Sequence, residues 1–214
     1  MKSKNNELIE NHLNEIFPNA GCELIYHKDY EFLIAVMLSA QCTDKKVNAV
    51  TEVLFSKYQS LEHLNASPLE DIENILKPLG LYKNKAKNLK GIVNDILNRF
   101  NGNVPIEKEE LVTLPGVGNK TASVYRAEIL HLNEFPVDTH VARISKRLGL
   151  AKEEDSVEVI ETKLKKNFNE GKWVKLHHQF IHFGRYKCKA IKPDCKDCKL
   201  AKICKNPLKV HYFW

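Results

Sequence analysis

The chain has 214 residues, of which 43% are hydrophobic and 28% are charged, and its formal net charge is +6. This composition is typical of a globular protein and supplies enough apolar side chains for one large domain or two small ones. The longest apolar run, residues 32–38, is too short to cross a membrane, and the polar first residues lack the apolar stretch of a signal peptide. We therefore expect a protein that stays in the cytoplasm and has no membrane partner.

Helical patterns occur along the whole chain, and no segment alternates as a strand would. The sequence Ser67-Pro68-Leu69-Glu70 predicts a helix start, with Ser67 as the N-cap and Pro68 at the first helical position. Apolar residues recur at helical spacing over residues 86–100 and 157–168. Because Pro and Gly separate such segments at short intervals, we expect an all-α fold of about ten helices joined by short loops.

A glycine-rich segment, Leu114-Pro115-Gly116-Val117-Gly118-Asn119-Lys120, is the first candidate for chemistry. We expect a short helix to end near Leu111 and another to begin near Asn119. The two glycines permit backbone conformations that other residues avoid. A hairpin of this kind can direct several N–H groups toward a phosphate at the positive end of the following helix. A plain connection between two helices is equally compatible with the pattern.

Asp138, in the sequence Pro136-Val137-Asp138-Thr139-His140, is the second candidate, and we expect it to be a helix N-cap. Lys120 is expected in the first turn of a helix that ends near Leu132 and is about 18 Å long. Residues 133–137 can span about 17 Å when extended, so the chain could return to the start of that helix. Lys120 and Asp138 could then face one another across a groove.

This pair of residue types has a definite chemistry. A lysine in the first turn of a helix meets the positive end of the helix dipole, which disfavours its charged form. The neutral amine attacks carbon and forms Schiff bases. A nearby carboxylate can stabilise positive charge that develops on a sugar, or move a proton. The alternatives are a surface lysine and a simple helix cap.

Four of the six cysteines lie close together near the C-terminus, in a segment where nine Lys and Arg stand against two Asp over residues 184–209. They follow the spacing C-x6-C-x2-C-x5-C and are Cys188, Cys195, Cys198 and Cys204. Four thiols at this spacing predict a shared metal centre, and zinc and a [4Fe–4S] cluster both remain open. The segment's charge of +7 suits thiolates or a polyanionic partner, or it is a solvated lysine-rich surface. We interpret the other cysteines, Cys22 and Cys42, as buried thiols.

The hairpin with Lys120, the segment around Asp138 and the four-cysteine motif, in this order, resemble the endonuclease III family of DNA glycosylase/AP lyases. The likeness covers nearly the whole chain. The sequences Ser39-Ala40-Gln41 and Leu79-Gly80-Leu81-Tyr82 are also similar to the DNA-probing loops of that family. The resemblance implies a helix–hairpin–helix glycosylase fold made of two packed helical domains.

The implied domain boundaries follow the same likeness. Residues 22–132 would form a six-helix domain that carries the hairpin. Residues 1–21 and 133–214 would form a second helical domain, with an iron–sulfur cluster loop at residues 188–204. The four cysteines of that loop would hold a [4Fe–4S] cluster.

The resemblance also implies an activity in base-excision repair. The protein would remove oxidised or damaged pyrimidines from double-stranded DNA and cleave abasic sites by β-elimination. Lys120 would be the nucleophile that forms the Schiff base, and Asp138 would be the essential carboxylate. The protein would act as a monomer associated with the nucleoid.

Gln41 and Leu81 would fill the hole left by an extruded nucleotide, because a base inside a duplex is out of reach until it is flipped out. The alternatives are a capping side chain for Gln41 and a core leucine for Leu81. The other expected DNA contacts are Gly116, Val117, Gly118, His140, Lys189 and Lys192.

Two features depart from the family pattern. Asn119 stands where many relatives carry a basic residue, which predicts one weaker phosphate contact. The last residues, 210–214, are apolar and indicate no role. Two rival functions remain. A monofunctional adenine glycosylase of the same fold would lack the catalytic lysine, and a non-enzymatic DNA-binding or zinc module would not need Lys120 together with Asp138.

Overall fold

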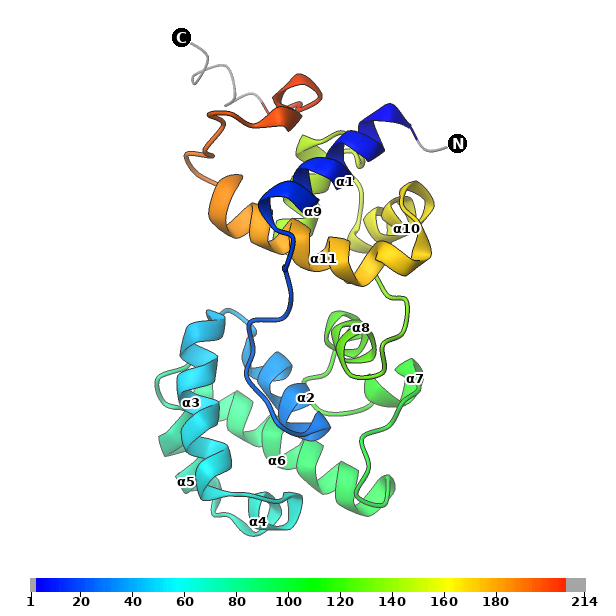
Figure 1. Ribbon diagram of the computed structural model, residues 1–214. Coiled ribbons are helices and arrows are strands. Elements are labelled where there is room, and N and C mark those ends of the chain that lie inside the picture. Colours follow the sequence, from blue (N-terminus) through cyan, green and yellow to red (C-terminus); the bar gives the residue numbers. More distant parts are fainter. Residues whose placement is uncertain (1–2, 207–214) are drawn as a thin grey trace. The chain divides into compact units, whose positions relative to one another are not determined.

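The computed structural model describes residues 3–206, and every regular element within them is a helix (Figure 1). The prediction of an all-α fold is confirmed. The apolar residues 210–214 lie outside the described part. Among the described helices none is long and apolar enough to span a membrane. The chain divides into two compact units, one formed by residues 23–132 and the other by residues 1–22 together with residues 133–214.

The unit of residues 23–132 is built around one almost completely buried helix. Its helices are α2 (Asp29–Leu38), α3 (Asp44–Lys57), α4 (Leu61–Ala66), α5 (Leu69–Leu76), α6 (Tyr82–Arg99), α7 (Lys108–Leu111) and α8 (Asn119–Glu128). Residues 30–38 of α2 are all buried, and α2 packs against α3, α6 and α8 (Figure 1). The buried Glu31 carboxylate accepts the N–H groups of His27 and Lys28 at 2.8 and 3.3 Å, which fixes the start of this central helix.

The start of α5 differs from the prediction. The N-cap is Pro68 and not Ser67, and α5 begins at Leu69. Ser67 instead ends α4, because its N–H binds the His63 carbonyl at 3.1 Å and its hydroxyl donates to the Leu64 carbonyl at 2.6 Å. The connection between the two helices is so short that one serine closes the first helix and is not available to cap the second.

The second unit joins the first helix of the chain to its C-terminal third. Its helices are α1 (Lys4–Ile16), α9 (Thr139–Arg147), α10 (Val157–Asn167) and α11 (Trp173–His182), with short helical turns at Glu170–Lys172, Phe183–Lys187 and Lys199–Lys202. Ile9 and Leu13 of α1 are fully buried in one core with Phe135, Phe168 and Phe180. Burial of such a side chain stabilises the fold by about 1.5–3 kcal/mol, so α1 is held by apolar packing.

The two cysteines outside the motif are not fully buried. Cys22 and Cys42 are both partly exposed, so the prediction of buried thiols is wrong. Both lie in loops that follow helices, α1 for Cys22 and α2 for Cys42. The sulfur of Cys42 lies 3.1 Å from the amine of Lys85.

Candidate active site

The glycine-rich hairpin has the form that the sequence predicts. Helix α7 ends at Leu111 and α8 begins at Asn119. Gly116 has a left-handed backbone with φ of +76°, and a Cβ at this position would lie 2.4 Å from the side-chain nitrogen of Asn88. Both facts favour glycine strongly over other residues in this turn. The Val117 N–H is engaged within the hairpin, where it donates to the Leu114 carbonyl at 3.1 Å.

Lys120 is the second residue of α8, and it is exposed. The N-cap of α8 is Gly118, which has no side chain to cap the first turn. The α-helical pattern offers no acceptor within the helix to the N–H groups of Asn119 and Thr121, whereas the Ala122 N–H binds the Gly118 carbonyl at 3.0 Å. The first turn of α8 therefore presents N–H groups and the positive end of a helix dipole, the combination that favours a phosphate.

The predicted length of this helix is wrong. Helix α8, which carries Lys120 in its first turn, ends at Glu128 and not near Leu132. The chain leaves the helical path in residues 129–132, where His131 has a left-handed backbone with φ of +52°. The helix is therefore too short for the predicted return of the chain over about 18 Å. That Lys120 and Asp138 face one another stays a prediction.

Asp138 is the N-cap of α9, as predicted. Its Oδ1 accepts the Val141 N–H at 2.8 Å, and the side chain is half-buried. The segment before it is anchored by His177, a buried residue whose Nδ1 lies 2.8 Å from the Pro136 carbonyl oxygen. The capping role is real, so any chemical role of this carboxylate must be additional to it.

His140 follows in the first turn of α9 and is half-buried. Burial lowers the pKa of its imidazole; the Asp138 charge raises it, and Arg143 and Arg185 lower it further. The ring nitrogen Nδ1 lies 3.2 Å from Nη2 of Arg143. A neutral imidazole of this kind can exchange hydrogen bonds with DNA, but it does not act as a fixed positive charge.

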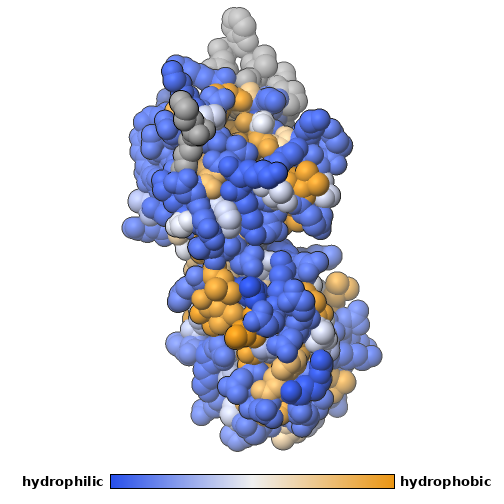
Figure 2. Space-filling view, turned by 90° about the vertical axis from the view of Figure 1, so that its right-hand side faces the viewer, coloured by the Kyte–Doolittle hydropathy of each residue, from blue (hydrophilic) through white to orange (hydrophobic). Residues whose placement is uncertain are grey.

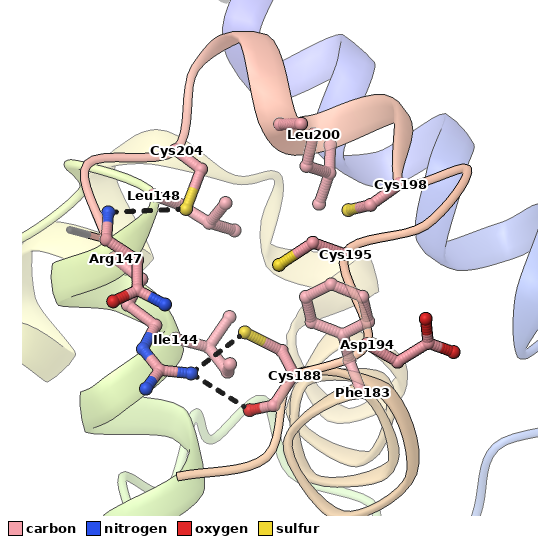
Figure 3. Close-up of a pocket in the computed structure, with 12 residues that line it drawn as sticks. Ile144, Arg147, Leu148, Phe183, Cys188, Asp194, Cys195, Cys198, Leu200 and Cys204 are labelled. Atoms are coloured by element: carbon pink, nitrogen blue, oxygen red, sulfur yellow. Dashed lines mark hydrogen bonds between the residues drawn. The ribbon is translucent and has the colours of Figure 1, made fainter. Parts of the chain in front are cut away.

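The four cysteines of the motif surround one pocket. Figure 3 shows the sulfur atoms of Cys188, Cys195, Cys198 and Cys204 directed toward a shared space. The rest of its lining is largely apolar and includes Ile144, Leu148, Phe183 and Leu200. In the described chain no three His, Cys, Asp or Glu side chains converge closely enough to hold a single metal ion. The thiols thus border a space and do not meet at a point.

Two donors stabilise negative charge on these sulfurs. Arg147 Nη1 donates to the Cys188 sulfur at 3.2 Å (Figure 3). The Asn206 N–H donates to the Cys204 sulfur at 3.4 Å. Burial raises the pKa of the Cys188 and Cys198 thiols, and at Cys188 the Arg147 hydrogen bond opposes this effect. A bound cationic centre would favour the thiolates further.

The loop after Cys188 presents its lysines to solvent. Lys189 and Lys192 are exposed, and Ile191 between them is 79% exposed. The backbone of the loop is fixed from inside by Arg147, which donates to the carbonyls of Lys189 at 2.8 Å and Ala190 at 3.0 Å. A rigid loop with outward lysines suits contacts to phosphates.

Gln41 and Leu81 share an unusual conformation in two loops of the other unit. Each has a left-handed backbone with φ of +58°, and each side chain is exposed, that of Leu81 to 61%. The alternatives are therefore excluded: Leu81 is not a core residue, and the cap of α3 is Thr43 and not Gln41. Figure 2 shows several hydrophobic areas on a largely hydrophilic face, so exposure of a hydrophobic side chain alone would be ordinary. Six described residues other than glycine have a left-handed backbone, and Leu81 is the only hydrophobic one among them.

Most of the chain is similar to proteins of one known family. Residues 34–170 match the HhH-GPD superfamily of base excision DNA repair proteins. The endonuclease III of Bacillus subtilis (strain 168) is 44% identical over 194 residues, which cover 91% of this chain and 89% of that protein. The chain belongs to the endonuclease III family. The resemblance inferred from its motifs is thereby confirmed.

Solved structures of the endonuclease III family have the same fold. One is a trapped covalent endonuclease III–DNA intermediate, with a TM-score of 0.91, 42% identity and 96% of each chain covered. Another is a non-covalent endonuclease III–DNA complex, with a TM-score of 0.92, 42% identity, and 97% of this chain and 98% of that chain covered. A thermostable thymine-DNA glycosylase, at 22% identity and a TM-score of 0.81, shows the fold alone.

Sequence reasoning missed the residues that hold this family's motifs in place. Arg143 and Arg147 lie one turn apart on α9, and both donate to the Cys188 carbonyl at 3.3 Å. Arg143 also donates to the Gly184 carbonyl at 2.8 Å. Position 184 needs glycine for this close approach, because a Cβ added there would lie 2.9 Å from the Cβ of His140. The spacing of four residues between two arginines was visible in the sequence, but it did not indicate that both face the cysteine loop.

Proposed function

We propose that this member of the endonuclease III family is a bifunctional DNA glycosylase and AP lyase that acts on oxidised or damaged pyrimidines in double-stranded DNA. The observation that carries the proposal is the place of Lys120. Its amine is exposed in the first turn of α8, a helix whose N-cap is Gly118. The hairpin before this helix is of the type that suits phosphate binding. A monofunctional glycosylase or a binding module has no need of an amine there.

In the proposed reaction Nζ of Lys120 forms a bond to C1′ of the damaged nucleotide. The bond between C1′ and the base breaks, and the base leaves with the bonding electrons and takes up a proton. The amino sugar opens to a Schiff base. Loss of a proton from C2′ then expels the 3′ phosphate, which cuts the strand 3′ to the lesion. An abasic site enters at the Schiff-base stage.

Asp138 has two roles in this proposal. Its Oδ1 caps α9 through the Val141 N–H, which holds the side chain in one orientation. A carboxylate fixed in this way stabilises positive charge on the sugar as the base departs, and it assists proton transfer. Because a fixed charge needs no rearrangement during the reaction, its effect on the transition state is large compared with that of a mobile side chain.

The DNA contacts follow from the surfaces already described. The first turn of α8, with Gly116 and Gly118 before it, binds a phosphate. Val117 supports this turn from the inside, since its side chain is 5% exposed and its N–H is engaged. The loop lysines and His140 bind further along the backbone. Gln41 and Leu81 enter the space of the extruded nucleotide, where an inserted side chain offsets lost stacking.

The pocket of the four cysteines fits a [4Fe–4S] cluster. Such a cluster is bulkier than a single ion and needs four thiolates around a space with an apolar lining and hydrogen-bond donors to the sulfurs. Cys188, Cys195, Cys198 and Cys204 would hold it, and Arg147 would stabilise its negative charge. A bound cluster would cross-link Cys188, Cys195, Cys198 and Cys204 and would add to the support that Arg147 gives the lysine loop.

Iron analysis tests the cofactor directly. We expect the purified protein to be yellow-brown and to contain about four irons per chain. A colourless protein with one zinc per chain would contradict the cluster but not the thiol centre.

A strand-cleavage assay tests the activity. We expect a duplex with one oxidised pyrimidine to be cut 3′ to the lesion without added alkali, because one enzyme carries out both base excision and β-elimination. Base release that leaves the strand intact until alkali is added would show a monofunctional glycosylase.

We further propose that the two units are the domains of the glycosylase fold, and that the protein acts as a monomer on the nucleoid in the cytoplasm.

A further inference from the structure

One buried lysine contacts both loops that carry the proposed DNA-probing residues. Lys85 lies in the first turn of α6 and is only 5% exposed. Its Nζ donates to the Ala40 carbonyl at 2.9 Å and to the Cys42 sulfur at 3.1 Å. These two acceptors belong to the residues immediately before and after Gln41. The lysine thus fixes the backbone on both sides of Gln41.

The same lysine is joined to Leu81 through its main chain. The Lys85 N–H donates to the Leu81 carbonyl at 3.0 Å, which forms the first turn of α6 above its left-handed N-cap. Gln41 and Leu81 both have φ of +58°. A left-handed backbone is unfavourable for residues other than glycine and persists only where the surroundings enforce it. The Lys85 side chain therefore ties the Gln41 loop to the first turn of α6, the helix that Leu81 begins as its N-cap.

A buried ammonium also makes this contact hard to replace. A charge taken out of water needs hydrogen-bond acceptors, and here it has a carbonyl and a sulfur from one tight loop. If that loop relaxed, the ammonium would lose its acceptors, so the loop and the lysine hold each other in place. Loss of the amine leaves the loop without this connection to α6.

We propose that Lys85 is a positioning residue that sets Gln41 and Leu81 in register with one another, so that both enter the extruded-nucleotide space together. This inference rests on the proposed DNA-probing role of those two side chains. Lys85 touches neither DNA nor the reacting atoms in this account. Its effect is limited to the step in which the damaged nucleotide leaves the duplex.

The test compares two substrates for one variant, Lys85→Met, which keeps the length and burial of the side chain without the charge. Single-turnover excision is measured on a duplex with a base-paired oxidised pyrimidine and on the same lesion in a bulge, where extrusion is already complete. We expect about a 10- to 100-fold loss on the paired lesion, because a small misplacement has an effect of this size, and little change on the bulge. Equal losses on both substrates would overturn the inference.

Lys90 of the same helix provides the matched control. Its Nζ donates to the carbonyls of Leu64, Asn65 and Ser67 at 2.9, 2.5 and 2.7 Å, so it holds a different loop. Lys90→Met should lower the melting temperature but leave the ratio of the two excision rates unchanged. A ratio altered as strongly as in Lys85→Met would show that any lost internal lysine acts on extrusion, and would contradict a specific role of Lys85.

A combined variant separates this inference from the proposed function. In Gln41→Ala/Leu81→Ala, adding Lys85→Met should cause no further loss on the paired lesion, because Lys85 acts only through those two residues. A further, additive loss contradicts the inference alone. If Gln41→Ala/Leu81→Ala excises the paired lesion at the normal rate, the DNA-probing role itself fails.

A second variant applies if Lys85→Met does not fold. Cys42→Val removes one acceptor of the lysine and must give a smaller loss confined to the paired lesion. An unchanged ratio of the excision rates on the two substrates would overturn the inference.

Discussion

Arg147 donates hydrogen bonds from Nη1 to the sulfur of Cys188 at 3.2 Å and to its carbonyl oxygen at 3.3 Å. Arg147 is the last residue of α9, and Asp138 is the N-cap of the same helix. The nine residues of α9 thus begin at the proposed catalytic carboxylate of Asp138 and end at Arg147, which contacts the first thiol of the cysteine pocket. The cysteine loop therefore contacts the same helix, α9, that positions the Asp138 carboxylate.

The first prediction concerns this arginine. Arg147→Met should weaken the iron–sulfur centre, because a hydrogen bond to a charged group contributes about 1.5–3 kcal/mol and its loss leaves a half-buried thiolate unsupported. The loss of visible absorbance on heating with an iron chelator measures the effect. Arg99→Met, at an exposed arginine paired with Asp95 on α6, is the control and should behave as wild type. Identical bleaching curves for both variants would show that Arg147 does not support the cluster.

The second prediction concerns the hairpin glycines. Gly116→Ala should lower the free energy of unfolding by about 1–3 kcal/mol, because alanine is strained at a left-handed backbone and its Cβ would collide with Asn88. Gly118 has a φ of −93°, and a Cβ added there by Gly118→Ala would lie in open space. It should cost less than about 1 kcal/mol. Denaturant unfolding of both variants decides the matter, and a smaller loss at 116 than at 118 would refute this account of the turn.

Much of this architecture could be predicted from residues alone. The hairpin was visible because Pro and two glycines interrupt a helical pattern, and the Asp138 cap was visible because Asp before a helix has a local meaning. The four cysteines were visible because their spacing is specific. Each of these features is local in sequence, so a single segment contains all of the information.

The features that sequence did not reveal depend on contacts between distant residues. Ser67 could not be assigned to the end of α4 without knowing how short its loop is in space. Lys85 looks like any surface lysine, and only the fold shows that it is buried beside the loop of Gln41, 45 and 43 residues from its two acceptors. The end of α8 is a local exception: His131 has a left-handed backbone and the Leu132 N–H binds the Arg126 carbonyl at 3.1 Å, but no glycine marks this turn in the sequence.

The third prediction concerns the exposed loop lysines. Lys189→Glu and Lys192→Glu should each weaken binding to DNA of any sequence and reduce the salt slope of binding by about one, since each phosphate contact releases one counterion. Lys166→Glu, at an exposed lysine of α10, changes the net charge equally and should leave the slope unchanged. Binding isotherms at several salt concentrations give the slopes. If all three variants share the wild-type slope, the loop is only a solvated surface.

The fourth prediction separates the two roles of Asp138. Asparagine is nearly as good an N-cap as aspartate, so Asp138→Asn should fold and bind DNA normally. Without the charge it should excise bases about 10²–10³-fold more slowly, which is the usual effect of losing one well-placed electrostatic group. Single-turnover excision at saturating enzyme measures this rate. Excision at the wild-type rate would mean that the carboxylate only caps α9.

Covalent trapping of the enzyme on DNA with borohydride tests the central claim, that the Lys120 amine forms the Schiff base. Borohydride reduces the imine to a stable amine, so wild-type protein incubated with a duplex that contains an abasic site should yield a cross-linked species. Lys120→Gln should yield none while still binding the same duplex, because no amine remains at that position and the hairpin is intact. Lys87→Gln, at an exposed lysine of the same unit, should trap as wild type does. A cross-link that persists at the wild-type level in Lys120→Gln would contradict the account.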